Sequence, residues 1–286
     1  VPLEGFTAFE DLLLGTVKRE NRDISPDPIL MKGDGFPTYH LANVIDDHLM
    51  EITHILRAQE WIASGPLHVL LYKAFGWTPP CYCHLPMVMG KDGQKLSKRH
   101  GSTSLRDFVQ EGYLPEAIIN YVTMVGWSYD DSREFFTKEE LEKLFSIEKI
   151  HKAPGVFDYK KLDWFNGQYI RKLAPDELKK RILPFLIEAD LIQNPPPQEE
   201  TVKLDQLIPL VQERLKKLGE LPDMVRFLFK PVKLQDPILL IPKKLDAKTV
   251  LSMFTLLEKW VDHFFEMDDL EAENSIRELA EAEGFK

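Results

Sequence analysis

The fold of this chain is decided by residues 81–101, which read CYCHLPMVMGKDGQKLSKRHG. Residues 81–88 are expected to form a strand, with Pro86 near its end. The loop that follows carries glycines at 90, 93 and 101 around Lys95-Leu96-Ser97-Lys98-Arg99. Glycines let successive backbone N–H groups face one anion, and the lysines and Ser97 add donors. Because short Lys/Arg runs are also common in solvated loops, the phosphate-binding interpretation depends on its context.

The context is a strand, a helix and a second strand. Residues 52–56 read ITHIL, which suits a buried parallel strand. Ser64-Gly65-Pro66 opens a helix that runs through Phe75 and closes at Gly76. With residues 81–88 this predicts a right-handed βαβ unit, and the Lys loop leaves the carboxyl end of its last strand. Ligands bind at that end of open α/β sheets, which favours a phosphate site.

Composition sets limits on the class of protein. The 286 residues, 44% hydrophobic, predict about two domains or more. No apolar run is long enough for a membrane span. The net charge is −10, but residues 261–286 hold nine acids and two bases, so the remainder is close to neutral and nucleic-acid binding is not excluded. Cys81 and Cys83 lack a second pair for zinc and fit a reducing, cytoplasmic compartment.

The chain before the βαβ unit is short and irregular. Residues 9–17 are expected to form a strand or short helix, and residues 23–28, DISPDP, form a turn-rich boundary. A short apolar run at 29–32 and a helix from Thr38 to about Met50 follow. In that helix Tyr39 and Asn43, four residues apart, share one face. The start at Val1, without Met or a basic and apolar leader, predicts a cut or processed terminus.

After residue 104 the pattern is helical. Pro115 marks one helix start, and Thr137 with Glu140 forms the signature of a capping box. Another helix follows Phe157, and further helices are expected at 175–190, 202–217, 221–229, 246–264 and 270–284. The predicted fold class is therefore α/β followed by an all-α region.

Five side chains near the two strands form a possible site. Tyr39 and Asn43 offer a phenol and an amide, and Arg57 at a strand's carboxyl end suits a carboxylate. Glu60 is an acceptor for hydroxyls or amines, and Trp61 is a flat surface for a purine. Each alone has a structural explanation, as core, cap, ion pair or packing. Together with the Lys loop they predict one crevice that binds a carboxylate, a base and a phosphate.

Other chemistries lack support. Several possible metal ligands gather nearby, but their spacing matches no closed ligand set and we expect no metal site: His40, Asp46, Asp47, His48 and His54. The chain contains no Gly-x-Ser-x-Gly, Walker or Gly-x-Gly-x-x-Gly motif. Serine hydrolase, P-loop and dinucleotide-binding classes are therefore not indicated.

Four segments resemble one known family, the bacterial-type glutamyl-tRNA synthetases of class I. They are residues 35–50 (GFPTYHLANVIDDHLM), 57–61 (RAQEW), 95–99 (KLSKR) and 157–171 (FDYKKLDWFNGQYIR). The first looks like the family's amino-acid-binding stretch and the third like its version of the Lys-Met-Ser-Lys-Ser loop. The resemblance covers nearly the whole chain and is strongest up to Lys172.

The resemblance implies a domain order and a set of site residues. Residues 1–27 would end an acceptor-binding insertion, 28–104 would be the second half of a Rossmann-type catalytic domain, 105–174 a helical stem-contact domain, and 175–286 a helical anticodon-binding domain. Glutamate would contact Tyr39, Asn43 and Arg57. ATP, with Mg²⁺, would contact Glu60, Trp61, Met87, Val88, Lys95, Ser97 and Lys98, and Lys95 and Lys98 would be the catalytic groups. The implied partners of a monomeric, cytoplasmic ligase are glutamate, ATP and tRNA(Glu).

One motif of the family is missing. His-Ile-Gly-His, its first nucleotide motif, occurs nowhere in these residues. We therefore expect a fragment without the first half of the nucleotide fold, unable by itself to form glutamyl-adenylate. Detectable glutamate-dependent ATP–pyrophosphate exchange by this chain alone would contradict that expectation.

Alternative functions stay open at this point. The chain would be a non-catalytic tRNA-binding module if only the helices after Leu105 act. The glutaminyl enzyme shares the Lys loop, but its anticodon part is a β-barrel, whereas this end is helical. The tRNA-modifying glutamyl relatives lack an anticodon part. Arg214 and Arg226 are candidate RNA contacts, although amphipathic helices carry such residues anyway.

Overall fold

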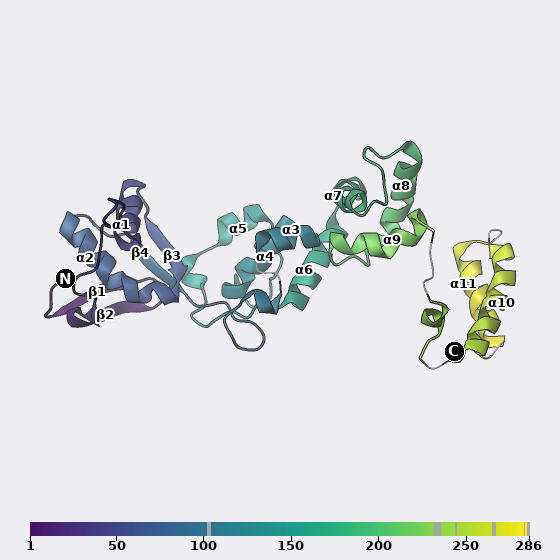
Figure 1. The fold of residues 1–286 in the computed structure, drawn as a ribbon, viewed down its shortest axis with the longest axis horizontal. Coiled ribbons are helices and arrows are strands. Elements are labelled where there is room, and N and C mark those ends of the chain that lie inside the picture. The colour runs from purple at the N-terminus through teal and green to yellow at the C-terminus, as the bar shows by residue number, and fades with distance from the viewer. Residues whose placement is uncertain (102–103, 232–235, 244, 265–266, 283, 285–286) are drawn as a thin grey trace. The chain divides into compact units, whose positions relative to one another are not determined.

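A computed structural model describes residues 1–101, 104–231, 236–243, 245–264, 267–282 and 284. The chain divides into two compact units, Val1–Phe229 and Lys230–Lys286 (Figure 1). The boundaries expected at residues 27, 104 and 174 lie inside the first unit, and they stay predictions.

Four strands form one sheet in the part of the chain that the structure describes. They are β1 (Phe6–Asp11), β2 (Gly15–Glu20), β3 (His54–Ala58) and β4 (Cys81–Leu85), in the order β2-β1-β4-β3. β3 and β4 are parallel, with Arg57 opposite His84, and α2 (Gly65–Phe75) connects them. The predicted order of strand, helix and strand is confirmed. β3 lies two residues later than the expected 52–56, and β4 ends at Leu85, immediately before Pro86, instead of at residue 88.

Residues 1–27 contribute more to this sheet than their sequence indicates. β1 and β2 form an antiparallel hairpin, and β1 also runs parallel to β4, with Asp11 opposite Tyr82. Residues 6–20 therefore belong to the same sheet as the βαβ unit. Their assignment to the end of an acceptor-binding insertion stays a prediction. The apolar run at 29–32 forms only an isolated bridge between Met31 and Pro37.

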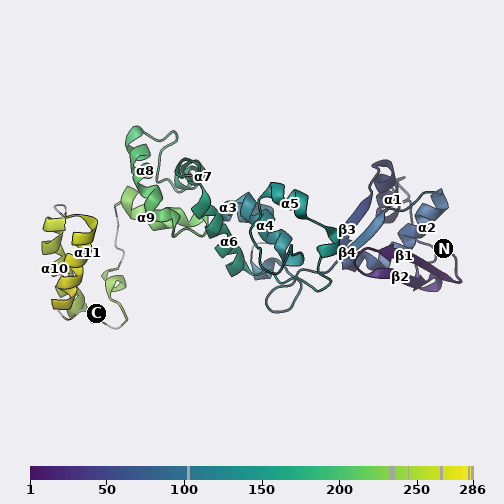
Figure 2. The ribbon, with the colours of Figure 1, turned by 180° about the vertical axis from the view of Figure 1, so that it is seen from behind.

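Two helices pack near the sheet (Figures 1 and 2). α1 (Tyr39–Leu49) lies against α2, and α2 lies against β1, around a core that includes Val44 and Tyr72. Gly65 begins α2 where a Cβ would stand 2.5 Å from the ring of Phe9, so only glycine lets the helix approach β1 this closely. Thr38 precedes α1, but its hydroxyl donates to the Ile29 carbonyl at 2.8 Å instead of capping the helix.

The next part of the first unit is helical, as predicted. Its helices are α3 (Leu105–Glu111), α4 (Pro115–Gly126), α5 (Lys138–Leu144) and α6 (Tyr159–Lys172). Pro115 is the first residue of α4, and Thr137 and Glu140 form the predicted capping box of α5. Aromatic side chains form much of the core here, among them Phe108, Tyr121 and Phe165.

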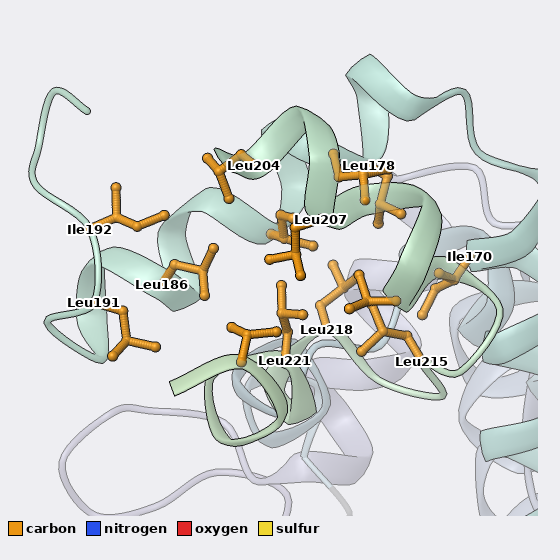
Figure 3. Close-up of a cluster of buried hydrophobic side chains, with 14 of the residues drawn as sticks. Ile170, Leu178, Leu186, Leu191, Ile192, Leu204, Leu207, Leu215, Leu218 and Leu221 are labelled. Atoms are coloured by element: carbon orange, nitrogen blue, oxygen red, sulfur yellow. The ribbon is translucent and has the colours of Figure 1, made fainter. Parts of the chain in front are cut away.

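A second apolar core joins α4 and α6 to α7 (Pro175–Glu188), α8 (Gln198–Gln212) and α9 (Leu221–Phe229). Figure 3 shows its leucines and isoleucines, with Leu178, Leu186 and Leu207 pointing toward a shared centre. Helix α8 begins four residues before its predicted start at 202 and ends five residues before 217. Because this core is shared, α7, α8 and α9 pack on α4 and α6.

The second unit contains α10 (Ala247–Phe264) and α11 (Asp269–Ala282). The helices expected at 246–264 and 270–284 are confirmed with small shifts: α10 begins one residue later and α11 one residue earlier. Residue 283 lies outside the described residues, and Gly284 is in a turn instead of the expected helix. Across the described ranges of the chain, no helix is both long and apolar enough to cross a membrane. Cys81 and Cys83 are free thiols, the first exposed and the second buried.

Candidate active site

The predicted site residues gather at the carboxyl ends of β3 and β4. Arg57 is the penultimate residue of β3, and Glu60 and Trp61 lie in the 3-10 turn that follows, Gln59–Ser64. Tyr39 and Asn43 occupy the first two turns of α1. The Lys loop begins directly after β4, so one end of the sheet brings these segments together.

Arg57 is held by uncharged acceptors. Its Nε donates to Nε2 of His84 at 3.0 Å, and its Nη1 lies 3.5 Å from Nδ1 of His68. Its Nη2 lies 3.5 Å from the carbonyl of Trp61, and its guanidinium lies 5.7 Å from the ring centre of Tyr82. No carboxylate of the described residues forms an ion pair with it. The positive charge is therefore available to an incoming anion.

The histidines beside Arg57 are kept neutral. Burial, followed by the charge of Arg57, lowers the pKa of His68 to about 3. The same two causes lower the pKa of His40, whose Nδ1 lies 2.9 Å from Nε2 of His68. Burial also lowers the pKa of His84, although Asp11 partly opposes the shift. Neutral imidazoles can accept hydrogen bonds from a guanidinium, which protonated ones cannot.

Asn43 presents an unused polar atom to this site. Its amide nitrogen donates to Oδ2 of Asp47 at 3.0 Å. Its amide oxygen is buried and has no hydrogen-bond partner among the residues that the structure describes. Burial raises the pKa of Asp47, and the charge of Arg57 opposes that shift. An unpaired buried acceptor is unfavourable unless a ligand donor completes it.

Tyr39 and Trp61, predicted to contact different substrates, touch each other. Their ring centres are 4.8 Å apart with the planes inclined by 36°. Both side chains are partly exposed, 47% for Tyr39 and 37% for Trp61. Each leaves an aromatic surface open to a ligand.

Four of the predicted ATP-binding residues line one cavity of about 430 Å³. It is bounded by Glu60, Met87, Val88 and Lys95, with Ala58, Leu85, Pro86 and Leu96 completing the wall. Lys95 Nζ lies 2.6 Å from Oε2 of Glu60, and both residues line the cavity. Trp61, Ser97 and Lys98 are not among the lining residues. The cavity supplies apolar walls for a base, an acceptor for hydroxyls and a cation for phosphate.

The rest of the Lys loop is an ordered turn with an exposed end. Ser97 and His100 cap each other, since the Ser97 N–H donates to Nδ1 of His100 at 3.0 Å. Nε2 of His100 lies 3.0 Å from Oδ2 of Asp92. Lys98 is exposed, so its ammonium can reach a ligand outside the cavity. The serine hydroxyl, by contrast, already lies 3.0 Å from His100 Nδ1.

Backbone and ionic contacts fasten this loop to the helical part. The N–H of Met89 donates to the Gly155 carbonyl at 2.9 Å, and the N–H of Phe157 donates to the Met89 carbonyl at 2.8 Å. Lys91 pairs with Asp158 at 2.9 Å. Residues 155–158, immediately before α6, therefore position the base of the loop.

The two candidate RNA contacts lie apart from this site. Arg214 is exposed just after α8, and Arg226 is exposed on α9, where it lies 3.3 Å from Oδ1 of Asp223. Both precede the second unit. The structure holds nothing that distinguishes them from other exposed arginines on helices.

Sequence reasoning missed three buried polar residues, Asp11, His68 and His84. Each is at most 3% exposed. The sequence does hold a signal for the two histidines. His84 lies two residues after Tyr82 in a predicted strand, on the same face, and His68 lies among the leucines of a predicted helix. Polar side chains on such buried faces need partners, which here are the groups around Arg57. No cluster of three or more metal-ligating side chains occurs in the described residues.

An α/β sheet with a cationic loop after its last strand, followed by helices, fits a class I synthetase. Residues 1–164 match the family described as tRNA synthetases class I (E and Q), catalytic domain, and the chain belongs to it. Residues 177–286 match the anticodon binding domain. The family resemblance seen in the sequence is thereby confirmed.

The individual relatives are glutamate–tRNA ligases. The whole of this chain is 55% identical to the glutamate–tRNA ligase of Borreliella burgdorferi, and the match covers 58% of that relative. The whole chain is also 50% identical to the glutamate–tRNA ligase of Treponema denticola, and that match covers 60% of the relative. Among solved structures, a glutamate tRNA ligase from Elizabethkingia meningosepticum in complex with its amino acid matches with a TM-score of 0.75 and 32% identity. That match covers all of this chain and 58% of the other.

Proposed function

We propose that the protein is a glutamate–tRNA ligase, which activates glutamate with ATP to glutamyl-adenylate and transfers it to tRNA(Glu). The chain spans about three fifths of the length of the relatives it matches, and all of those named above are glutamate–tRNA ligases. The observation that carries the proposal is Arg57, a guanidinium without an acidic partner among the described residues, at the carboxyl end of a parallel strand.

Glutamate is the amino acid that this arrangement favours. Arg57 would bind its side-chain carboxylate, as a fixed guanidinium does with two parallel hydrogen bonds. The buried amide oxygen of Asn43, which lacks a partner in the described part of the chain, would accept from a substrate N–H, and Tyr39 would cover the ligand. Glutamine would leave the charge of Arg57, which is partly buried, without a counter-charge, which is unfavourable.

ATP would occupy the cavity lined by Glu60, Met87, Val88 and Lys95. Trp61 and the apolar wall suit the adenine, and Glu60 suits a ribose hydroxyl. Mg²⁺ would enter with the phosphates, whose oxygens it prefers. When bound, the ion neutralises phosphate charge.

The chemistry needs positioning and charge stabilisation. A carboxylate oxygen of glutamate attacks the α-phosphorus, and the bond to the β-phosphate breaks, so that negative charge moves onto pyrophosphate. Lys95 and Lys98, with Ser97 between them, would follow that charge, because both side chains are exposed. A ribose hydroxyl of tRNA then attacks the activated carbonyl, and AMP leaves.

The helical parts would bind the tRNA. Residues 105–174 would contact its stem and 175–286 its anticodon, with Arg214 and Arg226 among the contacts. We further propose that the protein acts as a monomer in the cytoplasm.

ATP–pyrophosphate exchange tests the assignment in the complete protein that the gene encodes. Arg57→Ala should raise the KM for glutamate about 100-fold and leave the KM for ATP nearly unchanged, since a buried charge pair is worth a few kcal/mol. Lys98→Ala should lower kcat by about 100-fold, as loss of one transition-state donor does.

Matched controls are Arg19→Ala, an arginine on the same sheet, and Lys73→Ala, an exposed lysine on α2. Neither should change the glutamate or ATP parameters. An unchanged KM for glutamate in Arg57→Ala would refute the carboxylate assignment, and equal exchange with glutamine would refute the choice of amino acid.

A further inference from the structure

Asp11 is a buried carboxylate with a complete set of donors. Its side chain is fully buried, and its Oδ1 accepts from the N–H groups of Leu13 and Leu14 at 3.0 Å each. Its Oδ2 accepts from the N–H of His84 at 3.0 Å and lies 2.6 Å from Nδ1 of the same residue. Both carboxylate oxygens are therefore fully occupied by hydrogen-bond donors.

The hydrogen bonds decide which ring nitrogen of His84 carries its proton. Arg57 Nε–H can only donate, so Nε2 of His84 must accept and be unprotonated. The proton is therefore on Nδ1, where it is donated to Asp11. Asp11 sets the tautomer of His84, and that tautomer presents an acceptor to Arg57.

The three residues come from three adjacent strands. Asp11 ends β1, His84 lies in β4 and Arg57 lies in β3, and the sheet order places β4 between the other two. Arg57 and His84 are directly opposite in the parallel register. The chain of hydrogen bonds thus runs across the sheet to the carboxyl ends of its strands.

We infer that Asp11 and His84 are positioning residues that fix Arg57 through a neutral acceptor, so that its guanidinium keeps its charge for a substrate carboxylate. The inference rests on the proposed function of Arg57. An aspartate bonded directly to Arg57 would orient it equally well but would neutralise it and compete with the substrate. An imidazole between the two orients the guanidinium without that competition, and His68 Nδ1, 3.5 Å from Nη1, lies on another side of it.

Two substitutions of His84 separate positioning from packing. His84→Gln retains an oxygen that can accept from Arg57, whereas His84→Leu fills similar space without an acceptor. In exchange assays on the complete protein, His84→Leu should raise the KM for glutamate about 10- to 100-fold, and His84→Gln by only about threefold. The KM for ATP should not change in either variant.

Asp11→Asn tests the other end of the hydrogen-bond series that runs from Asp11 through His84 to Arg57. The amide must turn its NH2 donor either toward the N–H groups of Leu13 and Leu14 or toward His84. Either orientation sets donors against donors, which weakens the support that Asp11 gives to the Nδ1–H tautomer. We expect the KM for glutamate to rise about 10-fold or more. The ¹⁵N shifts of His84, which should show a protonated Nδ1 and a bare Nε2 in the unaltered protein, should change with it.

Thr7→Val is the matched control. Thr7 is buried on β1 and donates to Asn21 at 2.6 Å, so its loss affects stability without touching Arg57. Equal KM values for glutamate in His84→Leu and His84→Gln, or an Asp11→Asn variant that behaves as Thr7→Val does, would overturn the inference. If Arg57→Ala also leaves that KM unchanged, the proposed function fails as well. If Arg57→Ala alone raises it, only the positioning role is overturned.

Discussion

Acidification should lower the free energy of unfolding of the α/β part of the protein, and protonation of His68 in the unfolded state should account for a defined share of that decrease. This side chain is completely buried in α2, between Arg57 and His40. Its pKa in the folded protein is about 3, mainly because of burial and then because of the charge of Arg57. In the unfolded chain its pKa is expected to return to about 6.5. Below that pH, His68 is protonated in the unfolded state but stays neutral in the folded state.

The magnitude follows from proton linkage. Between about pH 7.5 and about pH 5.5, one histidine that titrates only in the unfolded state lowers the free energy of unfolding by about 1.4 kcal/mol. The sign is a loss of stability on acidification, because the folded pKa is the lower of the two. His40 and His84, whose pKa values are also lowered, add to the loss in the same direction.

His68→Gln isolates this share. Glutamine does not titrate in this range, yet it can still accept from Arg57 and donate to His40. Hydrogen exchange of peptides from α2 and β4, corrected for the intrinsic pH dependence of exchange, reports the local free energy of opening. Over the same pH interval, the free energy of opening should fall by about 1.4 kcal/mol less in the variant than in the unaltered protein.

An equal loss in both proteins would refute the reasoning. It would mean that His68 takes up its proton in the folded state as readily as in the unfolded chain. A smaller difference confined to α2, with none at β4, would contradict the assumption that α2 and β4 open together.

Two further predictions concern packing and are measured by urea denaturation. Leu186→Ala removes a fully buried side chain from the core in Figure 3 and should cost about 2–5 kcal/mol, whereas Val202→Ala, at a 49% exposed position of α8, should change stability by less than about 0.5 kcal/mol. Gly155→Ala would place a Cβ 2.0 Å from the Val125 carbonyl oxygen and should destabilise by about 1–3 kcal/mol or more, whereas Gly126→Ala meets nothing within 4 Å and should not. Equal midpoints within either pair would contradict the corresponding packing argument.

Local signals predicted most of the elements. Gly76 closes α2 in the left-handed conformation, Pro115 begins α4, and Thr137 caps α5, each as expected. These features depend on backbone conformation and on contacts within about four residues, which a sequence displays directly. The start of α8 was misplaced because Pro197 precedes a polar first turn that has no apolar periodicity.

The sequence by itself determined the class of site. Glycines around Lys95 and Lys98, an arginine at the end of a strand and an aromatic residue soon after it indicate the ligand chemistry, because side-chain type and position along an element do not depend on the remainder of the fold. The structure brings Glu60, Val88 and Lys95 together around one cavity, and their roles stay predictions.

Only the tertiary structure decided how Arg57 is held. Asp11 and His84 are 73 residues apart, and His84 and Arg57 are 27 apart, yet hydrogen bonds connect them across three strands. The pairing of β1 with β4 depends on long-range backbone hydrogen bonds and on burial of one shared face, which no local pattern in residues 1–27 reports. That pairing turns an isolated aspartate and a strand histidine into supports for the guanidinium.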